Sequence, residues 1–162
     1  MRSNFAVAFG VGLALIALAI GGIFFMQRGD VIDLPGKIIK VRTASLDEDS
    51  SIAVIDYRIS NSSDVQFEVR SVTVQLDGAD GATLKGDVSS ESDATRMFEA
   101  LPALGPKFLT SLMMRQRIGS HRSEDHMVAA RFQTPLAKMD ARKRFVLRIE
   151  EVEGKVFEYA ER

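Results

Sequence analysis

The feature that most constrains this chain is an uninterrupted apolar segment near its beginning. Residues 5–26, FAVAFGVGLALIALAIGGIFFM, contain no charged residue, no Asn, no Gln and no Pro. At about 1.5 Å per residue this segment makes a helix about 33 Å long, enough to cross a hydrocarbon core of about 30 Å. The sequence therefore predicts a transmembrane helix at 5–26, after a tail at 1–4, and places the rest of the chain beside a membrane.

A cleaved secretory signal is the alternative for this segment. Ala17-Leu18-Ala19 has the small-x-small pattern of a signal-peptidase site. The apolar run, however, continues from Ile20 to Met26 before the first polar residue. We therefore expect an uncleaved signal-anchor that crosses the inner (plasma) membrane once.

Two signals disagree on which side of that membrane the domain lies. Arg2 precedes the span, whereas Arg28, Lys37, Lys40 and Arg42 follow it. Counting Lys and Arg favours a cytoplasmic domain, but long domains are translocated largely regardless of their charge. Because a short basic tail before an apolar run is typical of signal-anchors, we expect a periplasmic or extracytoplasmic domain, with the cytoplasmic side as the alternative.

Composition restricts what the rest of the chain can be. The chain has 162 residues, which leaves room for one domain after the span. Its formal net charge is −1, unlike the strongly basic surface of nucleic-acid binders, so no nucleic-acid partner is expected. Cysteine is absent, which excludes disulfides, thiolate-bound zinc and thiol catalysis.

After a linker at 27–35, the apolar residues alternate as in β-strands. In 51–60, SIAVIDYRIS, the odd-numbered residues from Ala53 to Ile59 share one face, and Ile52 and Val54 lie on the other. Such a strand is buried on one side and half covered on the other.

Further strands follow, and one of them changes phase. Apolar positions are odd-numbered up to Val69 and even-numbered from Val72, which predicts a β-bulge near Arg70-Ser71. An Asp-Gly turn and a return strand at 83–88 come next. The sequence also predicts a strand at 127–133 and a hairpin from 145–152 and 156–159.

The middle of the chain departs from this pattern. Ala94, Met97, Phe98 and Leu101 have helical spacing and precede Pro102, which predicts a short helix. A further helical turn is expected within 135–143.

The succession of strand, Asn-Ser turn, VQFEVRSVTVQLDGADG and return strand, with the closing pair FVLRIEEVEGKVFEYA, resembles β-sandwich domains of the late-embryogenesis-abundant type 2 and FxLYD kind. It is also similar to small single-pass bacterial membrane proteins that carry such a domain behind one helix. The resemblance covers about residues 36–159 and implies an immunoglobulin-like sandwich. It implies no activity, because these families share no catalytic residues that map onto this chain. The expected fold is mainly β: one N-terminal transmembrane helix, then an immunoglobulin-like β-sandwich at 36–162 with a short helical insertion.

Motifs that carry chemistry are absent from the sequence. There is no Gly-x-Ser-x-Gly elbow, Ser-x-x-Lys dyad, P-loop or dinucleotide fingerprint. The two histidines, His121 and His126, are five residues apart and would lie on opposite faces of a strand, which disfavours a metal site. We therefore expect no enzyme, no catalytic residues, no cofactor and no metal.

Two surface patches are candidates for contact with a partner or with lipid. One is an apolar run that is either core or a methionine-containing docking surface: Phe108, Leu109, Leu112, Met113 and Met114. The other is a basic cluster, either a solvated face or a patch for anionic headgroups: Lys138, Arg142, Lys143, Arg144 and Arg148.

Small residues on the apolar segment form a third candidate site. Gly10, Ala14, Ala17 and Gly21 share one helical stripe, where small side chains let helices approach closely within lipid.

Two functions fit these observations. In the first, the chain is a non-enzymatic accessory or structural subunit of a larger membrane protein complex: the helix packs among other spans and the sandwich covers an extramembrane surface. In the second, it is a free tethered binding module that captures a peptide or small ligand on a sheet edge or on the apolar patch.

Overall fold

The computed structural model describes the backbone of residues 2–26 and 32–161 and the side chains of residues 9–22 and 32–161. The chain divides into two compact units, Met1–Val31 and Ile32–Arg162; we call the second the β unit. Met1 of the predicted tail and residues 27–31 of the predicted linker lie outside the described residues.

The first unit contains the helix α1 (Arg2–Met26), at the position where the sequence predicts a transmembrane helix. Among the residues that the structure describes, no helix is both long enough and apolar enough to span a membrane.

The β unit is built from eight strands and three short helices. The strands are β1 (Gly36–Ser45), β2 (Ser51–Asn61), β3 (Phe67–Asp77), β4 (Thr83–Val88), β5 (Arg117–Ile118), β6 (Arg122–Phe132), β7 (Arg144–Glu151) and β8 (Val156–Ala160). The helices are α2 (Glu91–Ala100), the 3-10 turn η1 (Pro102–Leu104) and α3 (Leu136–Asp140).

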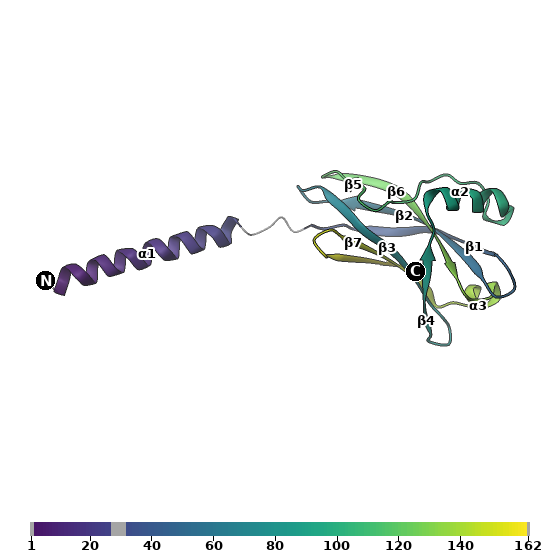
Figure 1. The fold of residues 1–162 in the computed structure, drawn as a ribbon, viewed down its shortest axis with the longest axis horizontal. Helices are drawn as coiled ribbons and strands as arrows, with labels where there is room; N and C mark the ends of the chain where they lie inside the picture. Colours follow the sequence, from purple (N-terminus) through teal and green to yellow (C-terminus); the bar gives the residue numbers. More distant parts are fainter. Residues whose placement is uncertain (1, 27–31, 162) are drawn as a thin grey trace. The chain divides into compact units, whose positions relative to one another are not determined.

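The strands form a sandwich-like pair of antiparallel layers, β1-β2-β6 and β3-β7-β8 (Figure 1). β4 connects the layers along one side, because Thr83–Gly86 pair with β3 whereas Asp87 and Val88 pair with β6. The short strand β5 pairs with the start of β3. The expectation of a mainly β fold with a few helices is confirmed at this level.

β2 has the two faces that its sequence predicts. Ala53, Ile55, Tyr57 and Ile59 lie in the main core between the layers, all fully buried. Ile52 and Val54 lie in a second core on the outer face of the β1-β2-β6 layer. Both faces of β2 are therefore covered.

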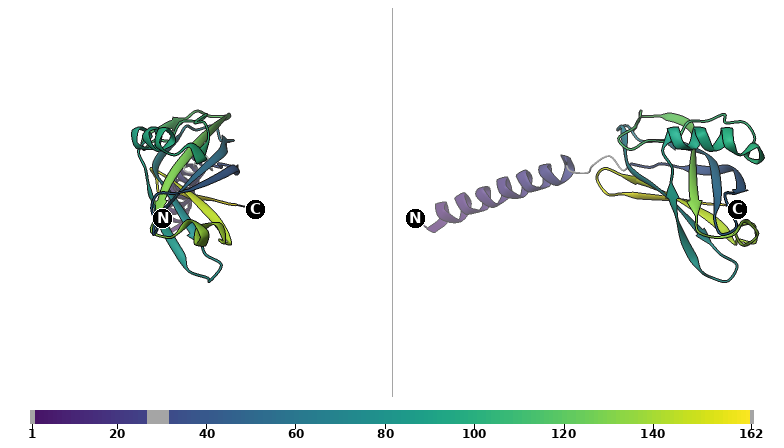
Figure 2. Two further views of the ribbon diagram at one scale, coloured as in Figure 1. Left: turned by 90° about the vertical axis from the view of Figure 1, so that its right-hand side faces the viewer. Right: turned by 45° about the vertical axis from the view of Figure 1, so that its right-hand side comes forward.

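The helix α2 covers the outer face of the β1-β2-β6 layer (Figure 2). Its first turn is capped by Ser90, whose hydroxyl accepts a hydrogen bond from the Asp93 N–H at 3.2 Å. Ala94 and Phe98 are buried against β2 and β6, as their helical spacing predicts. The predicted helix is confirmed.

Two irregularities bend the strands. The pairing of β3 with β7 shifts between Val69 and Ser71, which confirms the bulge predicted there. A second shift, at Ile39 of β1, was not predicted; the sequence around it shows no change of phase as clear as that in β3. The predicted β7–β8 hairpin is confirmed as well.

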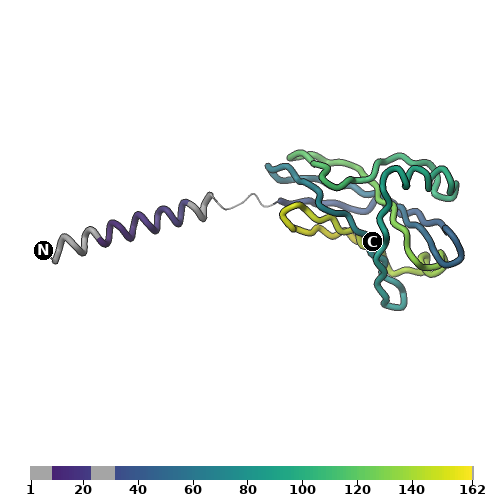
Figure 3. The backbone as a smooth tube through the Cα atoms, in the orientation of Figure 1, coloured from purple at the N-terminus to yellow at the C-terminus, as the bar shows by residue number. Residues whose placement is uncertain are grey.

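The β unit begins earlier than the predicted boundary at Gly36. Ile32 and Leu34, which the sequence assigns to the linker, are both buried in the main core. The Tyr159 hydroxyl donates a hydrogen bond to the Leu34 carbonyl at 2.5 Å. Figure 3 traces the backbone and shows the β7–β8 hairpin beside β1. The predicted linker is therefore too long at its C-terminal end, because Ile32 and Leu34 pack like core residues.

Candidate functional site

The predicted apolar patch lies in residues 106–116, which we call the Met loop. This segment has no helix, and its one strand-like contact is a parallel bridge from Ser111 to Met127 of β6. It follows η1 and leads into β5.

One side of the Met loop is fixed to the start of α2. Glu91 forms an ion pair with Lys107 and accepts a hydrogen bond from the Ser111 N–H at 2.7 Å. Burial alone would raise the pKa of Glu91. The hydrogen bonds from Lys107 and Ser111 together have a larger, opposite effect, so this pKa lies below its ordinary value. Glu91 is therefore a charged anchor of the loop at neutral pH.

Backbone contacts fix the loop to the two layers. The Met127 N–H donates to the Thr110 carbonyl at 3.0 Å, and the Arg115 N–H donates to the Val69 carbonyl at 2.7 Å. Between these contacts the Leu112 side chain is buried in the main core. The loop is thus held at several points along its length.

The five residues of the predicted patch separate into buried and exposed ones. Leu112 belongs to the main core, and Leu109 is partly buried against the second core. In contrast, Phe108 is 79% exposed, Met113 56% and Met114 70%. The predicted core position therefore applies to Leu112 and in part to Leu109, whereas Phe108, Met113 and Met114 are exposed and their role as a docking surface stays a prediction.

A groove of about 440 Å³ lies beside the exposed methionines. Val72 of β3, the half-exposed Val88 of β4 and the start of α2 form its other walls. A second groove of about 580 Å³, lined by Arg70, Arg115 and Arg117 among others, also includes Met114. In this second groove Arg70 is paired with Glu150 and Arg117 with Glu68. Met114 thus lies where an apolar groove and a groove lined by charged side chains adjoin.

The basic cluster predicted from the sequence is largely neutralised by acids from other strands. Its ion pairs are Lys138 with Asp80 at 3.0 Å, Arg142 with Glu161 at 2.6 Å, Arg144 with Asp77 at 2.8 Å and Arg148 with Glu158 at 2.7 Å. The charge of Lys143 also lowers the pKa of Asp77, although the hydrogen bond from Arg144 is the main cause. Asp77 and Asp80 are far from their partners in the sequence, so counting local charges could not find these two pairs.

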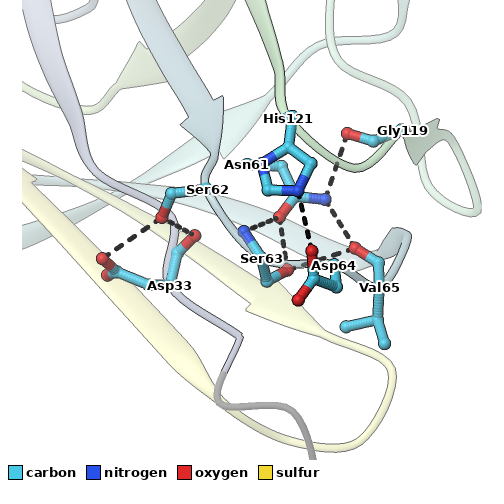
Figure 4. Close-up of polar contacts among 8 residues, drawn as sticks. All are labelled: Asp33, Asn61, Ser62, Ser63, Asp64, Val65, Gly119 and His121. Atoms are coloured by element: carbon cyan, nitrogen blue, oxygen red, sulfur yellow. Dashed lines mark hydrogen bonds and ion pairs between the residues drawn. The ribbon is translucent and has the colours of Figure 1, made fainter.

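A buried asparagine organises the end of the β unit where β2 stops (Figure 4). The Asn61 side-chain amide donates to the carbonyls of Val65, Ile118 and Gly119 at 2.8–3.2 Å. Its oxygen accepts hydrogen bonds from the N–H and hydroxyl of Ser63. All these polar groups satisfy one another, which is typical of a structural cluster rather than a reactive one.

The two histidines do not form a common site. The exposed His121 lies 2.8 Å from Asp64, and the buried His126 lies 3.0 Å from Glu124. Among the described residues no group of three or more His, Asp or Glu side chains is arranged to hold a metal ion.

The predicted helix-packing stripe of α1 is exposed in the structure: Gly10, Ala14, Ala17 and Gly21. A Cβ atom built on Gly10 or Gly21 would meet no described atom within 4 Å. Large apolar side chains between 50% and 72% exposed occur all around this part of the helix: Phe9, Val11, Leu13, Leu15, Ile16, Leu18 and Ile20.

Comparisons with known proteins return distant structural neighbours. No protein-family model matches the chain, and no curated protein matches it. One solved structure, an uncharacterized β-sandwich protein from Clostridium difficile, is 13% identical, with a TM-score of 0.38 and 81% of each chain covered. Another, a structural genomics target designated SoR45, is 9% identical, with a TM-score of 0.36 and 85% of each chain covered.

Proposed function

We propose that this chain is a membrane-anchored, non-enzymatic accessory subunit of a larger membrane protein complex. In this proposal α1 packs among other spans, and the β unit binds an extramembrane protein surface through the Met loop. The anchor crosses the inner membrane as a single-pass signal-anchor, with the β unit on the extracytoplasmic side.

The membrane anchor rests on the sequence of residues 5–26 and on the surface of α1. A helix that is apolar on all sides is covered either by the core of a large protein or by lipid. The large side chains from Phe9 to Ile20 are half or more exposed, so they need such a cover.

The observation that carries the partner proposal is the exposure of Phe108, Met113 and Met114 on a fixed loop. The loop is held by Glu91 on one side and by the buried Leu112 in its middle. Aromatic residues and methionine are enriched at protein interfaces, and a preformed loop loses little conformational freedom on binding.

The test is the size of the assembly after gentle solubilisation of membranes. We expect the chain to migrate with partners in a large complex, and the variant Met113→Ser, Met114→Ser to leave it. The matched control is Ile39→Ser, Val156→Ser, because these two side chains are also exposed, at 50% and 45%, but lie on β1 and β8, away from the Met loop. Migration of the unmodified chain as a monomer would reject the proposal.

A second candidate function is a tethered module that captures a peptide. The observation in its favour is that β1 and β8, the two ends of the strand order, form no ladder with each other among the described residues.

A further inference from the structure

The exposed oxidisable side chains of the β unit are concentrated in the Met loop. Met113 and Met114 are 56% and 70% exposed, whereas Met127 and Met139 are fully buried and Met97 is half-buried. The chain contains no Cys and no Trp, and both of its tyrosines are buried. In the described part of the β unit, the two adjacent methionines are therefore the thioethers that an oxidant in solution reaches most easily.

The backbone beside these two methionines is fixed in a tight turn. The Gln116 N–H donates to the Met113 carbonyl at 3.1 Å, and the Met113 N–H donates to the side-chain oxygen of Gln116 at 3.1 Å. Leu112, one residue before the turn, is buried in the main core. The turn therefore keeps both methionines at the surface, where a change in their polarity removes no core contact.

Both methionines line the apolar groove of about 440 Å³, together with Val72 and Val88. A sulfoxide oxygen in this groove is hydrated as long as the groove is open to water. Under an apolar partner surface the same oxygen loses its water, and burying a polar group without a new hydrogen bond costs free energy. Oxidation is therefore tolerated by the free chain and opposed by a partner that covers the groove.

From their exposure, the fixed turn and the groove, we infer that Met113 and Met114 form a reversible oxidation site, at which conversion of the thioethers to sulfoxides by a peroxide prevents the chain from joining its partner. This inference rests on the proposed function, because it concerns the regulation of the same surface. The peroxide acts on the free chain, since a partner bound at the groove covers both side chains.

The chemistry is the transfer of one oxygen atom to each sulfur. A lone pair of the thioether sulfur attacks one peroxide oxygen, an S–O bond forms, the O–O bond breaks, and hydrogen peroxide leaves as water. The sulfur loses two electrons and the peroxide gains them. Methionine sulfoxide reductases reverse the reaction, one enzyme for each sulfoxide epimer, so the site can return to its apolar form.

The first measurement is the rate of oxidation of each methionine by hydrogen peroxide, in the full chain in nonionic detergent, by peptide mass spectrometry. We expect Met113 and Met114 to be oxidised at least about tenfold faster than Met127 and Met139, because the latter two are buried. Circular dichroism and thermal unfolding of the chain oxidised at the turn are expected to match those of the untreated chain. Equal rates at all four positions would overturn the selectivity on which the inference depends.

The second measurement is incorporation into the assembly. The oxidised full chain is added to gently solubilised membranes from cells that lack the chain, and the fraction that migrates in the large complex is compared with that of the untreated chain. We expect about tenfold less incorporation after oxidation. Treatment of the oxidised chain with both reductases is expected to restore incorporation.

The matched control is Met113→Leu, Met114→Leu. Leucine keeps the two positions apolar but has no sulfur to oxidise, so this variant is expected to enter the complex equally well with and without peroxide treatment. It retains the half-buried Met97, and it therefore separates oxidation at the turn from oxidation elsewhere in the chain. The variant Met113→Gln, Met114→Gln, which is polar without oxidation, is expected to enter the complex as poorly as the oxidised chain.

Three results would overturn the inference while the proposed function stands. The first is equal incorporation of the oxidised and untreated chains. The second is a loss for the peroxide-treated leucine variant as large as that for the unmodified chain, which would place the responsible group elsewhere. The third is a loss that the two reductases do not repair. If the untreated chain enters no complex at all, the proposed function fails, and the inference fails with it.

Discussion

Arg42 of β1 and Asp56 of β2 form a nearly buried ion pair, with Arg42 Nη2 at 2.8 and 2.9 Å from the two carboxylate oxygens. The other guanidinium nitrogen, Nη1, donates to the carbonyls of Leu104 and Pro106, where η1 ends and the Met loop begins. The guanidinium also stacks on Phe98 of α2 at 4.9 Å. One side chain therefore ties the strands, α2 and the Met loop together.

We predict that Arg42→Met lowers the free energy of unfolding by about 3–5 kcal/mol, because it leaves the Asp56 carboxylate buried without its partner. Chemical denaturation of the β unit measures this loss. The control is Arg58→Met, whose partner Asp125 lies on β6 in an exposed pair, and there we expect a much smaller loss of unfolding free energy. Equal losses would contradict the anchoring role of Arg42.

The division of the Met loop into core and surface gives a second prediction. Leu112→Ala removes a side chain from the main core and is expected to cost about 2–5 kcal/mol of folding stability. Met114→Ala changes a side chain that is 70% exposed and is expected to cost about 0.5 kcal/mol or less. Thermal unfolding of the two variants measures these losses of stability. Equal losses would contradict the assignment of Leu112 to the core and of Met114 to the surface.

The pairing of Glu161 with Arg142 predicts a dependence of stability on pH. Burial raises the pKa of Glu161. The hydrogen bond and the charge of Arg142 have a larger, opposite effect, so the pKa lies below its ordinary value. A lowered pKa stabilises the fold above the unfolded-state value of about 4.3, and this contribution is lost as the pH falls toward the folded-state value. We therefore expect Glu161→Gln to be less stable than the unmodified chain at neutral pH, by about 1–3 kcal/mol.

That difference is expected to disappear in acid, where Glu161 is protonated. Glu99→Gln, at an exposed position of α2, serves as the control. A difference between Glu161→Gln and the unmodified chain that persists undiminished in acid would show that the charge of Glu161 is not the cause.

Glu151 gives a prediction of the opposite sign. Its side chain is buried, and burial together with the charge of Glu153 raises its pKa. A raised pKa stabilises the fold below the unfolded-state value and loses this effect as the pH rises through the folded-state value. Glu151→Gln is therefore expected to be more stable than the unmodified chain at neutral pH and equally stable in acid, as denaturant titrations at the two pH values would measure.

The proposed role of α1 is tested by Ala14→Leu, Ala17→Leu. Both changes keep the hydrophobicity that insertion needs but place bulky groups on the stripe of Gly10 and Gly21. We expect the variant to enter the membrane and to leave its assembly on purification. If it co-purifies with the same partners in the same amount, the helix is only a tether.

Local patterns in the sequence were sufficient for much of the fold. The change of phase after Val69 places the bulge, and the spacing of Ala94 and Phe98 places α2. The two apolar faces of β2 indicate that something covers its outer side, although the pattern does not say what. These features depend on neighbours within a few residues, which is the range that periodicity reports.

The candidate site depended on contacts between distant residues, and there the sequence was insufficient. Periodicity could not show which residues of the Met loop are buried and which are exposed. Leu112 is buried by strands that precede and follow the loop in the sequence, whereas Met114 is exposed. The groove lined by β1 and β8 was also missed, because the order of the strands decides which edges remain free, and β8 follows β1 by more than a hundred residues.

The pairing of β2 with β6 along its whole length has a consequence for synthesis on the ribosome. β2 emerges with only β1 as a neighbour, and its other edge must wait until β6 has been made. During that interval a strand that is almost wholly buried in the folded β unit is available to other nascent chains, so this is the stage at which aggregation competes with folding. A chaperone that binds nascent chains is therefore expected to act between the synthesis of Asn61 and that of Phe132.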